Sequence, residues 1–264
     1  MTTPFRLTEG EGPVLVSVPH ASLNVPDAIA ERLDENGALL ADADWHLDTI
    51  VDGIGGPASV IKAGFHRYVI DANRDPGGTS LYPGQATTAL VPLTDFDGRA
   101  IWKEGREPTV ADVDERRFSY HAPYHDALAG ELARLRDRHG IAVLLDVHSI
   151  RSVIPHLFEG TLTPFNVGTD YTRTCGGRFE EVATRLFREN GETVLNGRFR
   201  GGWTVRRHGR PTNNIHAVQI EMAQSLYMEE APPFALDPDG GARIGAILAR
   251  VVDALARTAL DHRG

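Results

Sequence analysis

The sequence contains a single cysteine, Cys175, among its 264 residues. One thiol cannot form an intramolecular disulfide or a multi-cysteine zinc site, so we expect the protein to work in a reducing cytoplasm. Long apolar runs are also missing, because none approaches the roughly 20 residues that a membrane-spanning helix needs. The first residues, MTTPFRLTEGEGP, lack a basic region followed by an apolar one. We therefore expect neither a signal peptide nor a membrane anchor.

Basic residues are fewer than acidic ones, which gives a formal net charge of -9 and a pI near 5.6. This excess of negative charge argues against general binding to nucleic acid. Arginines nevertheless gather in residues 198–210, RFRGGWTVRRHGR, where they could bind a small anion. The alternative interpretation of this cluster is a solvated surface loop.

The pattern of apolar residues predicts alternating strands and helices. Short apolar runs predict strands at residues 12–20, 58–64, 66–74, 141–149, 192–196 and 216–224. Helical spacing predicts helices at residues 25–37, 44–53, 118–138, 177–190 and 240–260. Residues 75–116 are rich in Gly, Pro, Thr and Asp and predict a long loop excursion. The alternation predicts a single three-layer α/β/α domain over residues 1–264, with a mixed, mainly parallel sheet.

Chemically active residues stand near the ends of three predicted strands. His20 follows the first strand, His148 ends the run LLDVHS, and Glu221 lies within VQIEM. The carboxyl ends of parallel strands face one side of a sheet, so these side chains could converge. Histidines and a carboxylate are ligands of catalytic zinc, and a further carboxylate could move the proton. The alternative for His148 is a core histidine with an acidic hydrogen-bond partner.

A second cluster of acidic residues lies in the segment DADWHLD, residues 42–48, where Asp44, His46 and Asp48 surround the start of a predicted helix. A third metal ligand could come from this segment. The alternative is a solvated helix start, because acidic side chains are favoured in the first turn by the helix dipole.

Six blocks of the sequence, in order along the chain, resemble one known family. The blocks are VSVPHAS (16–22), DADWHLD (42–48), HRYVIDANRDP (66–76), LLDVHS (144–149), GGWTVRRHGRP (201–211) and AVQIEM (217–222). Together they resemble the N-formylglutamate amidohydrolases, also called N-formylglutamate deformylases, of histidine degradation. The resemblance implies an α/β/α fold like that of the zinc carboxypeptidases, with one zinc ion or another divalent metal.

The resemblance also implies roles for individual residues of the metal site. His20 and His148 are the expected metal ligands, and Glu221 resembles the general acid/base of zinc carboxypeptidases. For the third ligand we favour Asp48 over Asp44, although both are expected on one face of the same helix. Asp146, two residues before His148, points to the same side of its strand and could orient a ligand, as could Asp44.

The expected substrate is a small anionic N-acyl amino acid, with no nucleic-acid or membrane partner. Arginine binds carboxylates in two-point contacts, and N-formylglutamate carries two carboxylates. Arg74, helped by Asn73, is the first expected substrate-binding residue, and Arg67 and Arg206 are expected at the second carboxylate.

The implied reaction is hydrolysis of N-formyl-L-glutamate to formate and L-glutamate. Three alternatives stay open at this point. They are deacylation of another N-acyl amino acid (a desuccinylase or aspartoacylase-like reaction), a non-catalytic protein that binds amino-acid derivatives, and a peptide carboxypeptidase with an open groove.

Overall fold

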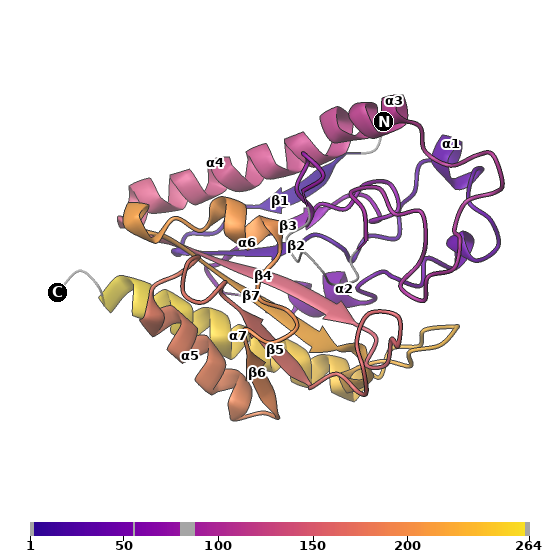
Figure 1. Cartoon of the computed structure of the whole chain (residues 1–264). Helices are drawn as coiled ribbons and strands as arrows, with labels where there is room; N and C mark the ends of the chain where they lie inside the picture. Colours follow the sequence, from indigo (N-terminus) through magenta and orange to yellow (C-terminus); the bar gives the residue numbers. More distant parts are fainter. Residues whose placement is uncertain (1–2, 55, 80–87, 262–264) are drawn as a thin grey trace.

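The computed structural model describes residues 3–54, 56–79 and 88–261, which are coloured along the chain in Figure 1. Within these residues, seven strands form one sheet in the order β1-β3-β2-β4-β7-β5-β6. The strands are Phe5–Thr8 (β1), Val14–Val18 (β2), Ser59–Ala63 (β3), Ala142–Ile150 (β4), Phe165–Gly168 (β5), Thr193–Leu195 (β6) and Ile215–Ala223 (β7). The α-helices are Asp27–Ala30 (α1), Leu47–Asp52 (α2), Val110–Arg116 (α3), Ala122–His139 (α4), Gly177–Arg188 (α5), Trp203–His208 (α6) and Pro238–Leu260 (α7). Shorter helical turns are Gly37–Leu39 (η1), Arg117–His121 (η2), Pro211–Asn213 (η3) and Gln224–Leu226 (η4).

The centre of the sheet is parallel. Strands β3, β2, β4 and β7 run in one direction, whereas β1 is antiparallel at one edge. At the other edge, β5 and β6 are parallel to each other, and β5 is antiparallel to β7. The predicted mixed, mainly parallel sheet is confirmed.

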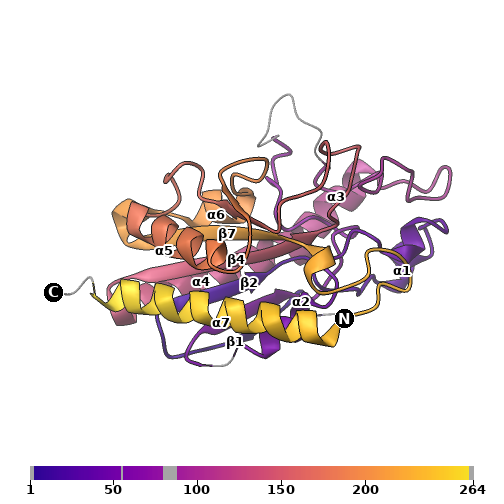
Figure 2. The same ribbon diagram turned by 90° about the horizontal axis from the view of Figure 1, so that it is seen from below.

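Helices cover both faces of the sheet, and strand β4 has apolar side chains that pack on both faces. Val143, Leu145 and Val147 belong to the core cluster that contains residues of α5 and α7. The alternate residues Ala142 and Leu144 belong to the cluster that contains residues of α4. Successive side chains of a strand point to opposite faces, so a strand buried on both faces is apolar throughout. Figures 1 and 2 show α4 on one side of the sheet and α5 with α7 on the other, which confirms the three-layer fold.

The strand expected over residues 66–74 is wrong, because this buried segment folds as turns. The Val69 amide donates to the His66 carbonyl at 2.9 Å, and the Arg74 amide donates to the Asp71 carbonyl at 3.2 Å. The Asp71 carboxylate also accepts the Asn73 amide hydrogen at 2.8 Å. An aspartate that binds the backbone two residues ahead favours a turn over a strand.

Two predicted helices are shorter than expected. The helix expected over 25–37 forms only as α1, Asp27–Ala30. The helix expected over 44–53 begins at Leu47, because His46 before it has a left-handed φ of 65°. That turn separates the backbone of Asp44 from the helix.

Several short strands and helices were not predicted from the sequence, among them β1, β5, α3 and α6. Helix α3 starts at a capping box in which Thr109 and Asp112 exchange side-chain and backbone hydrogen bonds, and it runs through η2 into α4. The loop excursion expected over 75–116 therefore ends in a helix, and its residues 80–87 lie outside the described residues.

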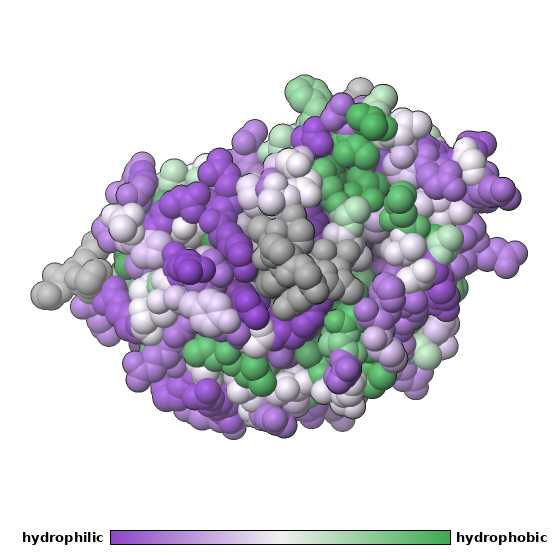
Figure 3. All heavy atoms as spheres, in the orientation of Figure 1, coloured by the Kyte–Doolittle hydropathy of each residue, from purple (hydrophilic) through white to green (hydrophobic). Residues whose placement is uncertain are grey.

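The part of the chain that the structure describes contains no helix long and apolar enough to cross a membrane. The face drawn in Figure 3 is mostly hydrophilic, and its hydrophobic residues form separate groups. Cys175 is buried and forms no disulfide.

Two glycines, one inside α4 and one just after its end, should respond in opposite ways to the same substitution. Gly140 ends the helix with φ 71° and its amide donates to the Arg136 carbonyl, so Gly140→Ala should destabilise the fold by about 1 kcal/mol. Gly130 lies inside the helix, and an added Cβ would meet nothing within 4 Å, so Gly130→Ala should stabilise by about 0.5–1 kcal/mol. Urea unfolding of both variants measures this, and shifts of the same sign would contradict the assigned helix end.

Candidate metal and catalytic site

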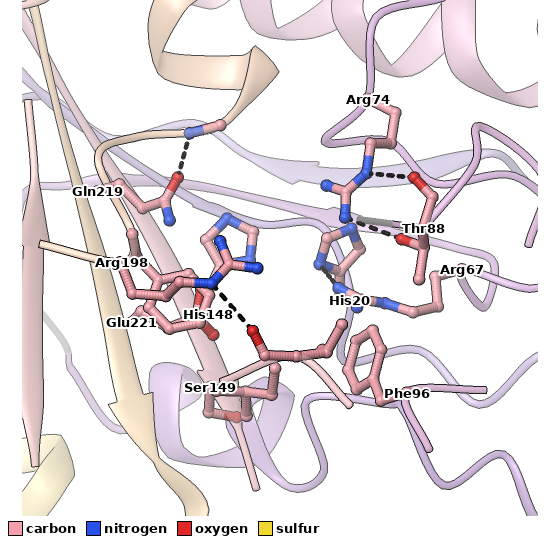
Figure 4. Close-up of a pocket in the computed structure, with 14 residues that line it drawn as sticks. His20, Arg67, Arg74, Thr88, Phe96, His148, Ser149, Arg198, Gln219 and Glu221 are labelled. Carbon is pink, nitrogen blue, oxygen red and sulfur yellow. Dashed lines mark hydrogen bonds between the residues drawn. The ribbon is translucent and has the colours of Figure 1, made fainter. Parts of the chain in front are cut away.

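The predicted site residues meet at the carboxyl ends of the central strands. His20 follows β2, and in the register of β4 and β7 His148 lies directly beside Glu221. All three side chains are almost fully buried and line one pocket. Figure 4 shows His20 and His148 side by side, with Glu221 next to His148.

Three side chains at this edge of the sheet bring together atoms that could bind a metal. His20, Asp44 and His148 each offer one ligand atom, and these atoms lie within 4.8 Å of one another. Asp44 Oδ2 is 4.0 Å from His20 Nδ1 and 3.5 Å from His148 Nδ1. The same carboxylate oxygen accepts the Ser149 amide hydrogen at 3.1 Å. Two imidazoles and one carboxylate form a donor set that fits catalytic zinc.

The far nitrogen of each histidine is bound by a second carboxylate. His20 Nε2 lies 2.8 Å from Asp71 Oδ1, and His148 Nε2 lies 2.8 Å from Asp146 Oδ2. An ionised carboxylate can only accept, so each Nε2 carries the hydrogen and each Nδ1 faces Asp44. Arg67, which can only donate, contacts His20 Nδ1. Carboxylates in this position fix the ring orientation and the tautomer of metal-binding histidines.

Charges around the two histidines shift their pKa values in opposite directions. Burial, strengthened by the Arg67 guanidinium, lowers the pKa of His20 to about 4 and favours its neutral ring. Burial also opposes a charge on His148, but the carboxylates of Asp146 and Asp44 outweigh it and raise the pKa of His148 well above its usual range. A positive charge is therefore favoured between these two carboxylates, as a bound cation would require.

The pKa of Glu221 is shifted in the opposite direction from that of Asp44. Burial, with the Asp44 charge adding to it, raises the pKa of Glu221 to about 7. By contrast, nearby histidines and Arg67 outweigh burial and lower the pKa of Asp44. A carboxyl with a pKa near neutrality can both accept and return a proton.

The expectation of Asp48 as the third ligand is corrected by the geometry. Asp48 is exposed on α2, and its backbone carbonyl accepts from Lys62 Nζ at 2.6 Å. Asp44 takes the place beside the histidines because its amide donates to the His20 carbonyl at 3.0 Å. The left-handed turn at His46 then directs the following helix away from the site.

Arg74 lies at the pocket, and Asn73 lies behind its lining residue His148. Asn73 Nδ2 is 3.2 Å from His148 Nε2, and its Oδ1 accepts the Thr204 amide hydrogen at 2.9 Å. Arg74 lines the pocket and donates to the backbone and side-chain oxygens of Thr88 at 3.1 and 2.8 Å. Arg67 also lines the pocket, with its guanidinium 4.9 Å from the centre of the Phe96 ring.

Arg206 is not among the described residues that line this pocket. Its Nε donates to the Gly201 carbonyl at 2.9 Å, and its Nη2 lies 3.3 Å from Asp170. The expectation that Arg206 binds a substrate carboxylate is therefore corrected. Arg198, from the same arginine-rich segment, lines the pocket instead. The spacing of the arginine cluster did not indicate which member lines the pocket.

Two histidines that the sequence did not single out hold the segment with Asp71 and Asn73 from behind. His121 Nε2 donates to the Arg74 carbonyl at 3.0 Å, and His125 Nε2 donates to the Ala72 carbonyl at 2.8 Å. They are four residues apart on one continuous helical stretch, so both side chains reach the same backbone segment. Their spacing was the only signal available in the sequence.

Comparison with known proteins identifies the family of this chain. The family model for N-formylglutamate amidohydrolase matches residues 12–228. The chain belongs to this family. A curated N-formylglutamate deformylase of Pseudomonas putida is 42% identical over 252 residues, covering 94% of this chain and 93% of the relative. Its counterpart in Pseudomonas aeruginosa is 40% identical over 257 residues and 93% of each chain.

Two solved structures share the fold. The crystal structure of N-formylglutamate amidohydrolase from Ralstonia eutropha JMP134 superposes with a TM-score of 0.78 at 25% identity, covering 97% of both chains. A gene product from Agrobacterium tumefaciens has a TM-score of 0.73 at 18% identity and covers 97% of this chain and 96% of its own. The second likeness concerns the fold alone.

The raised pKa of Glu221 makes the stability of the metal-free protein depend on pH. The folded state keeps the proton up to about pH 7, whereas the unfolded chain releases it near 4.5, so this contribution is complete below pH 4.5 and is lost as the pH rises through 7. Glu221→Gln should remove the loss and gain on the order of 2 kcal/mol over the wild type between pH 5 and pH 8. Urea unfolding with chelator at both values tests this. Parallel pH dependences of the two proteins would refute the assignment.

Proposed function

We propose that this protein is a zinc-dependent amidohydrolase that cleaves N-formyl-L-glutamate to formate and L-glutamate. The observation that carries the proposal is the pairing of two carboxylate-held histidines and Asp44 with a buried Glu221 in one pocket. Relatives with 40–42% identity over most of the chain are named N-formylglutamate deformylases, which supports the same substrate.

His20 and His148 would hold the metal through Nδ1, and Asp44 would hold it through a carboxylate oxygen. When bound, zinc supplies a Lewis acid that polarises a carbonyl and lowers the pKa of water. Asp71 and Asp146 keep the two imidazoles in the required tautomer and orientation.

Glu221 would move the proton of the reaction. With a pKa of about 7 it can take a proton from the attacking water and later donate it to the departing nitrogen. The water oxygen joins the formyl carbon, the C–N bond breaks, and the products are formate and the amine of glutamate. Arg67 faces the same space and would offset negative charge that develops on the carbonyl oxygen.

Arg74 and Asn73 would position the substrate. The Arg74 guanidinium is held by Thr88 at the pocket wall, so it is preorganised for a carboxylate. Asn73 fixes the pocket wall, because its Oδ1 accepts the Thr204 amide hydrogen at the start of α6.

We also propose that the chain acts as one domain, because both apolar clusters use the same sheet. The unpaired, buried Cys175 is consistent with a reducing cytoplasm.

Formate release from N-formyl-L-glutamate tests the reaction. Glu221→Gln should lower kcat by about 1,000-fold with little change in KM, because the group that moves the proton is lost. Glu229→Gln is the matched control, since Glu229 is exposed and carries the same charge. Full activity in Glu221→Gln, or turnover of N-acetyl or N-succinyl amino acids in preference to the formyl substrate, would overturn the proposal.

Metal binding separates Asp44 from Asp48. Asp44→Asn should weaken zinc affinity by more than about 100-fold because it removes a ligand, whereas Asp48→Asn should leave the affinity unchanged. Competition with a chromophoric chelator measures both constants. Equal zinc affinity in Asp44→Asn and wild type would exclude Asp44 as a ligand.

A further inference from the structure

The segment between β7 and α7 has no role in the proposed chemistry, yet its residues 224–234 bind the chain on both sides of Asp44. Gln224 directly follows β7 and is almost fully buried. Its Nε2 donates to the Ala43 carbonyl at 2.9 Å. Gln224 therefore holds the residue that precedes Asp44.

Phe234, at the other end of this segment, holds the two residues that follow Asp44. The ring of Trp45 stacks on the ring of Phe234, with centroids 4.8 Å apart and planes inclined by 25°. His46 Nε2 lies 2.7 Å from the Phe234 carbonyl oxygen, which can only accept, so the imidazole donates this hydrogen bond. His46 is also the residue with the left-handed φ of 65°. Its side chain therefore anchors the turn that separates Asp44 from α2.

Gln224 also connects the segment of Asp44 to the end of β4. Its Nε2 lies 3.4 Å from Ser149 Oγ, which accepts the Tyr227 hydroxyl hydrogen at 2.6 Å. The Ser149 amide in turn donates to Asp44 Oδ2 at 3.1 Å. One buried amide thus contacts both the residue before Asp44 and the residue after His148, so it helps to set the distance between two of the proposed metal ligands.

We propose that Gln224 and His46 are positioning residues that fix the direction of the Asp44 carboxylate toward the metal. This inference rests on the proposed function, because it takes Asp44 as a metal ligand. Partners that orient a metal ligand typically contribute about 10- to 100-fold to metal affinity. Neither residue is among the described residues that line the pocket, so their loss should weaken metal binding and leave substrate binding unchanged.

Two substitutions at His46 separate the side-chain bond from the backbone turn. Asparagine adopts a left-handed φ readily but is too short to place a donor where His46 Nε2 lies, whereas glutamine reaches that position with its own Nε2. His46→Asn should weaken zinc affinity by about 10-fold or more, and His46→Gln should stay within about 3-fold of the wild type. The conformational preference of the turn alone predicts the opposite order. Competition with a chromophoric chelator measures the affinities.

Gln224→Met tests the other end of the segment. Methionine keeps the length of the side chain and removes the donor, so zinc affinity should fall by about 10-fold, while KM for N-formyl-L-glutamate at saturating zinc should change by less than about 2-fold. His139→Asn is the matched control, because His139 Nε2 donates to the Glu11 carbonyl at 2.9 Å before the start of β2. This control loses the same type of bond far from the strand ends that carry the site, and its zinc affinity should equal that of the wild type.

Circular dichroism in the presence of chelator establishes that each variant is folded. If Gln224→Met does not fold, the two His46 variants decide the proposal, and if His46→Asn does not fold, Gln224→Met decides it. Equal zinc affinities in His46→Asn and His46→Gln, or wild-type affinity in Gln224→Met, would overturn it.

Zinc binding needs no turnover, so the measurement separates this inference from the proposed reaction. If the wild type releases no formate but His46→Asn binds zinc more weakly than His46→Gln, the reaction fails and the positioning role stands. If formate is released but His46→Asn and Gln224→Met bind zinc as tightly as the wild type, the reaction stands and the positioning role is refuted.

Discussion

The hydrogen bond between each site histidine and a buried carboxylate is the constraint on which the rest of the site depends. With Nε2 held by Asp71 or Asp146, each ring presents Nδ1 to the same small space. A metal needs lone pairs in fixed directions, and a histidine that could rotate or change tautomer would not supply them. The carboxylates are themselves fixed: Asp146 accepts from Ser17 at 2.7 Å, and Asp71 lies in a turn braced by the helix behind it.

The parallel sheet turns this local constraint into a catalytic arrangement. Its carboxyl edge brings His20, after β2, next to residues of β4 and β7 that lie more than 100 positions further along the chain. Parallel register sets His148 beside Glu221, and the two core clusters below exclude water from both. Burial then gives the carboxylates different roles, because Asp44 lies between cationic partners and stays ionised whereas Glu221 keeps a proton up to about pH 7.

The sequence predicted most of what depends on strong periodicity and missed what depends on single backbone angles. Strands β2, β4 and β7 and the long helices were predicted because each buries a continuous apolar face. The short strands β1 and β5 carry too few residues for a pattern. The choice of Asp48 over Asp44 failed because it assumed a continuous helix, which the left-handed His46 interrupts. Likewise, the sequence did not show which arginine of residues 198–210 lines the pocket, because residue spacing did not predict the short helix α6 in this segment.

A crystal structure of the zinc-loaded protein, with anomalous scattering recorded at the zinc edge, tests the central claim most directly. The account predicts one zinc peak at about 2.0–2.2 Å from His20 Nδ1, His148 Nδ1 and a carboxylate oxygen of Asp44, with both Nε2 atoms still bound to their carboxylates. A zinc ion bound through either Nε2, or held by Asp48, or located away from these strand ends would contradict it.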